Sequence, residues 1–226
     1  SADVDGDGQA DLLLGVPDDD ATDDGALYVI YGPVTGSQDL SSYDARLRGA
    51  LTGEALGSGV AVLGDIISTG ADAVLLGAPD SSLAAAGAGI AYVALGPLSG
   101  DVRVSTVSAV MAYGEAAGDE AGHAIDVAGD LSGDGLGDLV VGAPGEDSGG
   151  TDAGAAYIYT GMTSGLVSLA DADVKATGAA AGDAAGWSVA GAGDIDDDGL
   201  ADLPIGAPLE STGGPPAGAV DARPRR

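Results

Sequence analysis

One motif recurs along the chain with a period near 64 residues, and this periodicity restricts the fold more than any other sequence feature. Three nine-residue segments share the pattern Asp-x-(Asp/Ser)-x-Asp-Gly-x-x-Asp, and they start at Asp3, Asp130 and Asp194. Another copy starts at Asp65 and has lost most of its carboxylates. The four starts are separated by 62, 65 and 64 residues. Such regular spacing predicts a single supersecondary unit that is used several times.

The segments that flank each aspartate-rich loop also repeat. A strand-like run that opens with glycine precedes the loop at positions 57, 122 and 186. A short apolar run that ends in Gly-x-Pro follows it, at 15–17, 77–79, 142–144 and 206–208. Next comes a run rich in Tyr and β-branched residues, at 26–31, 90–95 and 155–159. A weaker run follows near 46–51, 107–113 and 174–177, so each unit is predicted to hold four short strands.

The predicted fold class is all-β, because no segment shows the sustained 3.6-residue period of an amphipathic helix. One sheet of four short strands cannot bury both of its faces, whereas sheets stacked around an axis can. We therefore predict a β-propeller with four-stranded blades. A β-solenoid, whose repeats are usually shorter, and an unclosed array of blades are the alternatives.

The length of the chain sets the number of blades. At this period 226 residues make about 3.5 units, below the ~4–8 blades of closed propellers, so we expect a partial ring. The propeller part is predicted at 1–209, with blades at 1–53 (lacking its first strand), 54–118, 119–182 and, incomplete, 183–209. Residues 210–226 begin like a third strand and then become basic and proline-rich, so we expect a disordered tail of a truncated or frame-shifted product.

The order of these elements resembles the FG-GAP repeat over residues 3–208. The fourth copy gives the order clearly: Gly-Trp-Ser-Val-Ala, the aspartate loop, and then an apolar run with Gly-Ala-Pro. FG-GAP repeats build the propeller of integrin α subunits and of many bacterial surface or secreted proteins, so the resemblance implies a propeller of this type. Leu56, Ala121 and Ala185 replace the Phe of the FG element, which is expected to weaken packing between blades without changing the fold.

The spacing of the carboxylates predicts calcium-binding loops. Aspartates at alternate positions 1, 3 and 5 direct their side chains to one point, and glycine at position 6 permits the sharp turn. Position 7 usually offers a backbone carbonyl, and the Asp at position 9 is the last ligand. Position 12 is apolar (Leu14, Val141 and Ile205), which excludes an EF-hand. Oxygen ligands without His or Cys favour Ca²⁺ over zinc or copper, and Mg²⁺ resists full dehydration.

We therefore expect about three Ca²⁺ sites per chain. The predicted ligands are, in the first copy, Asp3, Asp5, Asp7, Gln9 and Asp11; in the third, Asp130, Ser132, Asp134, Leu136 and Asp138; and in the fourth, Asp194, Asp196, Asp198, Leu200 and Asp202. Ser132 is expected to weaken its site because it replaces a carboxylate. The copy at Asp65 has Ile67, Thr69 and Ala73 at ligand positions, with Asp72 one place out of register, so no ion is expected there.

Composition excludes several functional classes. The 36 acidic residues against 7 basic ones give a formal net charge of -29, which argues against binding to nucleic acid or to an anionic membrane surface. The absence of cysteine excludes disulfides, thiolate metal sites and a thiol nucleophile. His123 is the single histidine, and no Ser–His–Asp arrangement fits the repeat. No apolar stretch reaches the ~20 residues of a membrane span, so no membrane insertion is expected.

The resulting prediction is a non-enzymatic, calcium-stabilised propeller that is secreted by a bacterium or carried on its surface and that binds a protein or glycan, as in adhesion. Calcium is expected to clamp the hairpin between the first two strands of a blade. Such loops fill at the ~10⁻⁴–10⁻³ M calcium found outside cells, which favours an exported protein. The alternatives are a purely structural segment of a larger secreted protein and a propeller hydrolase. Trp187 is interpreted as a packing residue or a sugar platform, and residues 18–20 as a solvated or partner-binding loop.

Overall fold

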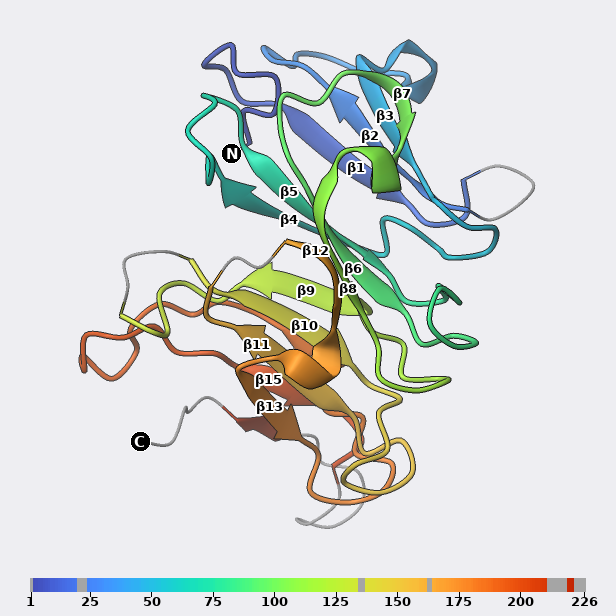
Figure 1. Ribbon diagram of the computed structural model, residues 1–226. Coiled ribbons are helices and arrows are strands. Elements are labelled where there is room, and N and C mark those ends of the chain that lie inside the picture. Colours follow the sequence, from blue (N-terminus) through green and yellow to red (C-terminus); the bar gives the residue numbers. More distant parts are fainter. Residues whose placement is uncertain (1, 20–23, 134–136, 162–163, 211–218, 222–226) are drawn as a thin grey trace.

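The computed structural model describes residues 2–19, 24–133, 137–161, 164–210 and 219–221, and it confirms the all-β prediction (Figure 1). Helical structure in these ranges is limited to three short 3-10 turns, η1 (Leu40–Ser42), η2 (Val104–Thr106) and η3 (Leu169–Asp171). None of the described helical segments is long and apolar enough to cross a membrane.

The strands form four sheets that follow one another along the chain. In chain order the described strands are β1 (Leu12–Val16), β2 (Ala26–Ile30), β3 (Ala45–Arg48), β4 (Gly59–Gly64), β5 (Ala73–Ala78), β6 (Ile90–Ala94), β7 (Gly100–Arg103), β8 (Ser108–Tyr113), β9 (Ala124–Val127), β10 (Leu139–Ala143), β11 (Ala155–Tyr159), β12 (Gly165–Ser168), β13 (Val174–Thr177), β14 (Ser188–Val189), β15 (Ile205–Ala207) and β16 (Ala219–Asp221). The sheet orders are β1-β2-β3-β7, β12-β8-β6-β5-β4, β13-β11-β10-β9 and β14-β15-β16. Each sheet is built on one sequence unit, and we number the blades one to four accordingly.

Apolar side chains of the middle strands fill the spaces between successive blades. Every residue of β5 and β6 is buried, which is why these runs are apolar without alternation. Successive side chains of a strand point to opposite faces of the sheet. Accordingly, Val74 and Leu76 pack into the cluster shared with blade one, whereas Ala73 and Leu75 pack into the cluster shared with blade three. This arrangement is that of face-to-face blades in a partial propeller.

The two repeated glycines of each unit meet across the blade boundary. A Cβ atom on Gly77 of β5 would lie 1.9 Å from the carbonyl oxygen of Gly122, which precedes β9 in the next blade. The corresponding distance from Gly142 to the oxygen of Gly186 is 2.0 Å. The first strands β4, β9 and β14 lie next to one another. The glycine of Gly-x-Pro is therefore required because the backbone of the following blade occupies the space of a side chain.

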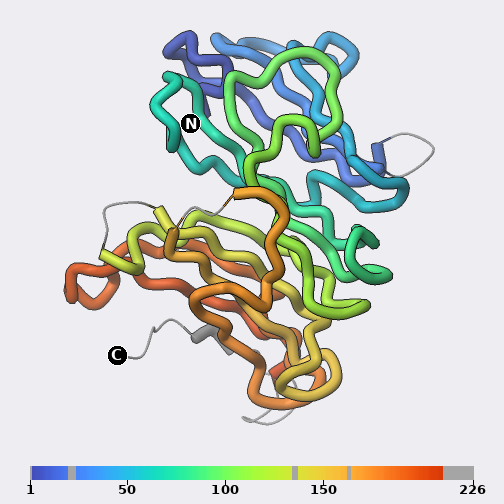
Figure 2. The backbone as a smooth tube through the Cα atoms, in the orientation of Figure 1, coloured from blue at the N-terminus to red at the C-terminus, as the bar shows by residue number. Residues whose placement is uncertain are grey.

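Two strands were not predicted from the sequence. β7 pairs in parallel with β3 of blade one, and β12 pairs in parallel with β8 of blade two. Each of these strands belongs to the sequence unit that follows the blade it joins, so the units 54–118 and 119–182 each hold a fifth strand besides the four that were predicted. Figure 2 shows the segment around β12 (orange) running beside the strand from blade two (green). We call β7 and β12 the straps.

The C-terminal segment also departs from the sequence prediction. Residues 219–221 form β16, which pairs antiparallel with β15 and places Ala219 opposite Ala207. The predicted disordered tail is therefore wrong for these three residues, because Ala219 and Val220 continue the sheet as Ala155 and Ala156 do in β11. The remainder of that tail beyond Glu210, at 211–218 and 222–226, lies outside the described residues.

Candidate metal centres

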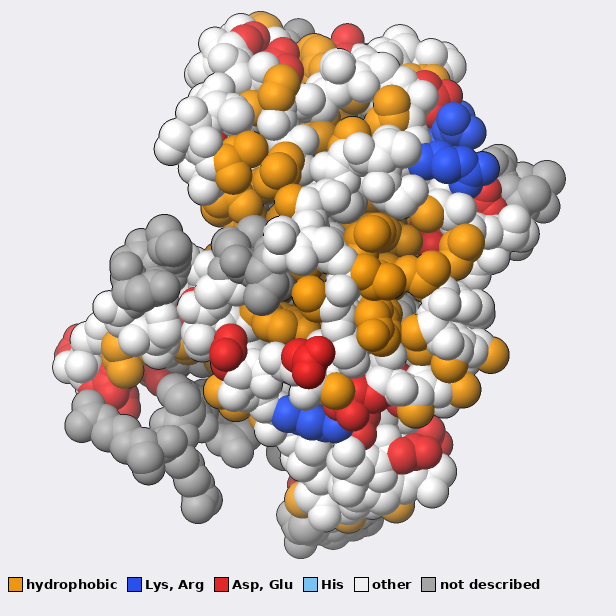
Figure 3. Space-filling model, in the orientation of Figure 1, with side chains coloured by type: hydrophobic (Ala, Val, Ile, Leu, Met, Phe, Trp, Pro, Cys, Tyr) orange, Lys and Arg blue, Asp and Glu red, His pale blue; other side chains and the backbone are white. Residues whose placement is uncertain are grey.

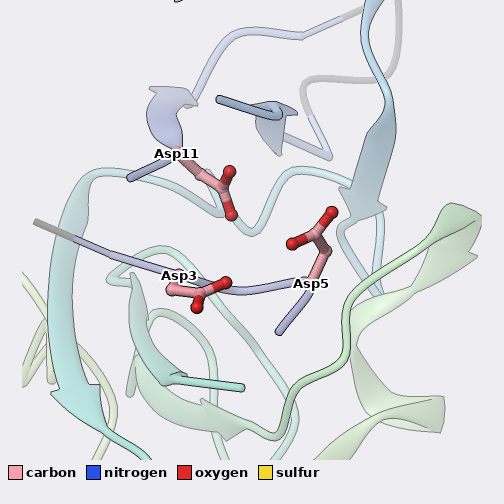
Figure 4. Close-up of side chains that lie close together, drawn as sticks. All are labelled: Asp3, Asp5 and Asp11. Atoms are coloured by element: carbon pink, nitrogen blue, oxygen red, sulfur yellow. The ribbon is translucent and has the colours of Figure 1, made fainter. Parts of the chain in front are cut away.

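The aspartate loop of the first repeat is folded around the carboxylate of Asp3. Its Oδ1 accepts hydrogen bonds from the backbone N–H groups of Gly6 (2.9 Å) and Asp7 (3.1 Å), and its Oδ2 accepts from Gly8 (2.8 Å). This turn places carboxylate oxygens of Asp3, Asp5 and Asp11 within 4.8 Å of one another. Figure 4 shows these side chains facing a common space, with Asp11 at the start of β1 and the other two on the preceding loop.

The loop of the fourth repeat has the same construction. Asp194 Oδ1 accepts from the N–H of Asp198 (3.0 Å), and Asp194 Oδ2 accepts from that of Gly199 (2.8 Å). Carboxylate oxygens of Asp194, Asp196 and Asp202 again lie within 4.8 Å of one another. The structure thus brings together positions 1, 3 and 9 of the motif in both loops, and in the fourth repeat the loop is the turn between β14 and β15.

The aspartate at position 9 ties the end of each loop to its beginning. One oxygen of Asp11 accepts from the backbone N–H of Val4 at 2.8 Å, and one oxygen of Asp202 accepts from that of Ile195 at 2.7 Å. The other oxygen of Asp11 accepts from the N–H of Gly32, which follows β2 (2.8 Å). The position-9 carboxylate therefore holds the hairpin closed and also faces the other carboxylates.

Position 5 is not part of the converging group. The carboxylate of Asp7 turns toward Gln9, accepting from its backbone N–H (2.8 Å) and from its side-chain amide (2.9 Å). Asp198 Oδ1 likewise accepts from the N–H of Leu200 (2.9 Å). The inclusion of Asp7 and Asp198, and of the carbonyls of Gln9 and Leu200, among the ligands stays a prediction.

The loop of the third repeat is described only in part, because predicted ligands Asp134 and Leu136 lie outside the described residues. Asp138 is buried and accepts from the N–H of Leu131 (2.7 Å), as its equivalents do in the other loops. Asp130 Oδ1 accepts from the N–H of Gly133 (2.6 Å), and the hydroxyl of Ser132 lies 3.5 Å from it. A neutral hydroxyl thus stands where the other loops have a carboxylate.

The degenerate loop of the second repeat closes on one carboxylate. Asp65 accepts from the N–H groups of Thr69 (2.9 Å) and Gly70 (2.8 Å), and these hydrogen bonds lower the pKa of Asp65. In the first loop, by contrast, desolvation and the charges of Asp7, Asp11 and Asp3 raise the pKa of Asp5. A hard cation would relieve this crowding, and the all-oxygen donor set suits Ca²⁺.

Asp72 has a role that the sequence did not reveal. Its Oδ2 accepts from the backbone N–H of Asp3 (2.9 Å), and its own N–H donates to the carbonyl of Asp3 (2.7 Å). At the same position of the fourth loop, the N–H of Ala201 donates to the carbonyl of Asp130 (3.2 Å). Position 8 of one loop thus contacts position 1 of the loop in the preceding blade. Asp72 is therefore a support for the first loop.

A second group of acidic residues lies buried between the blades. Glu54, Asp119 and Asp183, each three positions before the repeated glycine, are at most 2% exposed. Glu54 accepts from the N–H of Ala50 (2.6 Å) and from the hydroxyl of Tyr92 (3.1 Å). Burial raises the pKa of Glu54. The recurrence of an acidic residue at this position is the sequence signal that could have identified the group.

Lys175 of blade three links an acidic residue of blade two with one of blade three. The Lys175 ammonium donates to Glu115 (2.7 Å) and to the buried Glu146 (2.9 Å), and it lies over the ring of Tyr157. In blade one Arg46 has the corresponding place, where it lies 3.5 Å from Asp19. In the loop 18–20, Asp18 is exposed and Asp19 is half-buried beside Arg46, whereas Asp20 lies outside the described residues. These ion pairs join strands within a blade and across neighbouring blades.

His123 and Trp187 contact each other at the boundary between blades three and four. Their ring centroids are 4.5 Å apart, and Trp187 remains 50% exposed. His123 Nδ1 lies 3.9 Å from a carboxylate oxygen of Glu120. Trp187 thus packs against the neighbouring blade and keeps one part open to solvent.

The acidic character predicted from composition is visible at the surface. On the face shown in Figure 3, basic side chains occupy few places and most of the surface is neutral or acidic. Lys and Arg contribute 7 residues in the whole chain against 36 Asp and Glu.

Comparison with protein families identifies the repeat. The FG-GAP repeat family matches residues 121–159 and 185–221, which hold the third and fourth aspartate loops with their flanking strands. Repeats of this family are typical of extracellular and cell-surface propellers. The curated proteins include no significant match to the chain.

Proposed function

Because this chain is an FG-GAP repeat protein, we propose that it is a calcium-stabilised extracellular propeller, secreted or carried on a bacterial surface, that binds a protein or a glycan. One observation carries the proposal: three aspartate carboxylates converge at the same place in the first and fourth repeats. Two independent loops with the same geometry are better explained by a shared ligand than by acidic turns that merely face solvent.

Calcium would act here as a clamp on a hairpin. In the first loop it would be held by Asp3, Asp5 and Asp11, and in the fourth by Asp194, Asp196 and Asp202. The ion supplies positive charge to carboxylates that otherwise repel one another. The carboxylate at position 9 already ties the end of the loop to its start. An ion that joins it to the carboxylates at positions 1 and 3 would therefore fix the whole turn.

Extracellular calcium suits these loops. Sites with this kind of ligand set in extracellular modules bind in the ~10⁻⁴–10⁻³ M range, so they fill outside cells. An ion that binds only the folded chain stabilises it by mass action. Three ions would also bring the formal charge from -29 to about -23.

The proposed role is binding without catalysis. The ring of His123 lies against Trp187, and its Nδ1 is 3.9 Å from Glu120; neither of these two neighbours supplies the hydroxyl nucleophile that a Ser–His–Asp hydrolase needs. The rim loops and the half-exposed Trp187 are surfaces on which a protein or glycan could bind. A purely structural role within a larger secreted protein is the alternative, and it requires no ligand.

Calorimetric titration with Ca²⁺ and Mg²⁺ tests the metal part of the proposal. We expect Ca²⁺ to bind more tightly than Mg²⁺, and Asp5→Asn and Asp196→Asn each to remove one site. Asp80→Asn is the matched control, because Asp80 is an exposed aspartate outside the loops. Undetectable binding, or a number of bound ions that is unchanged in Asp5→Asn and in Asp196→Asn, would contradict the metal assignment.

Screening the calcium-loaded chain against immobilised glycans and surface proteins tests the binding part. We expect at least one ligand to be retained, with weaker retention after chelation. A chain that binds calcium and retains no ligand would instead support the structural alternative.

A further inference from the structure

The aspartate loop of the first repeat is joined to the strap β7 through Val4. In the chain Val4 lies between the candidate ligands Asp3 and Asp5. Its N–H donates to the carboxylate of Asp11 at 2.8 Å. Its carbonyl accepts at 2.8 Å from the N–H of Leu98, which lies two residues before β7. A single residue thus connects the candidate metal ligands with the segment that leads into the strap.

Buried side chains strengthen the same connection. Val4 and Leu98 are buried in one apolar cluster, and Val102 of β7 packs against this cluster. The hydroxyl of Tyr31, the residue after β2, donates to the carbonyl of Leu98. The backbone of Leu98 is therefore held at its N–H by the first loop and at its carbonyl by blade one.

Gly96 shows how closely the segment before β7 approaches the loops. A Cβ atom on Gly96 would lie 3.1 Å from the carbonyl oxygen of Val4 and 2.8 Å from that of Asp72. In the next unit Gly161 has the place of Gly96, and among the described residues nothing lies within 4 Å of its Cβ position. The close packing at this glycine therefore distinguishes β7 from β12, and β12 can serve as an internal control.

The strap itself fastens the second sequence unit to blade one. It belongs to the unit 54–118, yet it runs parallel to β3 of blade one with Val102 opposite Leu47 (Figure 1). The carboxylate of Asp101 in the strap contacts Arg46 at 2.9 Å and Arg48 at 2.6 Å, and both arginines are on β3. Whatever fixes the start of the strap therefore also fixes a contact between two successive units.

We propose that calcium binding at the first loop and attachment of the strap β7 to blade one stabilise each other. The inference rests on the proposed function, because it requires an ion at Asp3, Asp5 and Asp11. An ion that joins Asp3 to Asp5 restrains the backbone between them, and this backbone includes the Val4 carbonyl that holds Leu98. The ion and the strap thus favour the same conformation of the loop, and such coupling is reciprocal.

Hydrogen exchange of the full chain in saturating calcium and in EDTA tests the coupling from the side of the ion. The probe is the Leu98 amide, because it donates to the carbonyl of Val4. We expect calcium to slow its exchange by about fivefold or more, and to change the amides of β12, at 165–168, much less. Asp5→Asn should abolish the effect at Leu98. Asp196→Asn, the matched change in the fourth loop, should preserve it.

Calorimetry on the same samples reports calcium binding, so the two levels of the argument can be separated. If calcium binds at the first loop and the Leu98 amide exchanges at the same rate as in EDTA, the coupling is overturned and the proposed function stands. Equal slowing at Leu98 and in β12 would also overturn the coupling, because it would report general stabilisation of the fold. If no calcium binds, both the coupling and the proposed metal site are overturned.

Arg103→Gln tests the coupling from the side of the strap. Arg103 ends β7 and donates to the carbonyls of Gly49 (3.1 Å) and Ala50 (2.9 Å) in blade one. Loss of these bonds should loosen the strap and lower calcium affinity at the first loop by about two- to tenfold, measured in the Asp196→Asn chain. Loss of a positive charge alone acts in the opposite direction, since it strengthens the attraction of calcium. Lys175→Gln is the control for charge. Calcium affinity in Arg103→Gln that equals or exceeds that of Lys175→Gln would overturn the proposal.

Discussion

Asp72 shows how a single residue in a degenerate repeat can serve its neighbour. It accepts from the N–H of Asp3 and donates to its carbonyl, so it fixes the backbone of a residue whose carboxylate faces Asp5 and Asp11. Residues that hold a metal ligand in place commonly change metal affinity although they do not touch the ion. Blade two thus supports the first loop, although its own loop lacks the ligand pattern.

Substitution of Asp72 is expected to weaken calcium binding at the first loop alone. Asp72→Ala removes the acceptor for the Asp3 N–H and should lower calcium affinity there by about tenfold. Asp72→Asn keeps an acceptor oxygen and should recover part of the loss. Calcium titration of both variants in an Asp196→Asn background, in which the fourth loop is disabled, measures the effect. If the Asp196→Asn chain, its Asp72→Ala derivative and its Asp72→Asn derivative all bind calcium with the same affinity, Asp72 does not support the first loop.

The buried Glu54 predicts a definite pH dependence. Burial raises its pKa in the folded state above that of the unfolded chain, so the folded state binds the proton more tightly. The contribution of Glu54 to stability is therefore fully present at low pH and falls as pH rises above the usual glutamate value near 4.3. Glu54→Gln keeps the shape and removes the titration.

Urea unfolding of the wild type and of Glu54→Gln between pH 4 and pH 7 measures this contribution. The wild type should lose stability relative to the variant as pH rises. The comparison is made between the two chains because repulsion among the other carboxylates affects both. Parallel pH profiles would contradict the assignment of Glu54 as a buried titrating group.

At the scale of strands and loops, the strands that were predicted correctly are those with a recognisable local pattern of apolar residues. The Tyr-containing run at β6 is buried throughout, and its apolar residues identified it as a strand. The straps could not be predicted in this way. β7 is Gly-Asp-Val-Arg, which is too short for a periodic signal, and it becomes a strand because β3 lies beside it. Tertiary pairing of this kind overrides local propensity.

In the aspartate loops too, some features follow from the spacing of residues, and others depend on contacts that spacing does not reveal. Spacing predicted the convergence at positions 1, 3 and 9, because loop geometry follows from alternating side chains and glycine. Spacing did not predict that Asp7 turns to Gln9, which depends on local hydrogen bonds. It also could not reveal the contact of Asp72 with Asp3, since these residues are 69 positions apart.

The contact between repeated glycines predicts a strong effect of a small substitution. Gly77→Ala would place a methyl group 1.9 Å from the carbonyl oxygen of Gly122, so the two blades would have to move apart. We expect a loss of roughly 3 kcal/mol or more in the free energy of unfolding. Gly161→Ala is the control, because nothing lies within 4 Å of its Cβ position. Urea denaturation gives both values, and similar stability of the two variants would refute the steric explanation.

At the scale of the whole molecule, four sheets stack in sequence, and β1 and β16 are the last described strands at the outer ends of the first and fourth sheets. Blade four contains three strands among the described residues, and its β14 has only two residues. We predict that the isolated chain forms an open arc, kept monomeric by the repulsion of its net charge of -29. Small-angle scattering measures this shape. A compact, disc-shaped monomer with a central channel would contradict the prediction.

The central claim is that calcium bound at the aspartate loops stabilises the propeller. Thermal unfolding of the full chain in millimolar calcium and in EDTA, followed by circular dichroism, tests it most directly. The account predicts a higher Tm in calcium, a smaller calcium-dependent shift in Asp196→Asn, and full recovery when calcium is restored after chelation. An unfolding curve that is the same in calcium and in EDTA would contradict it.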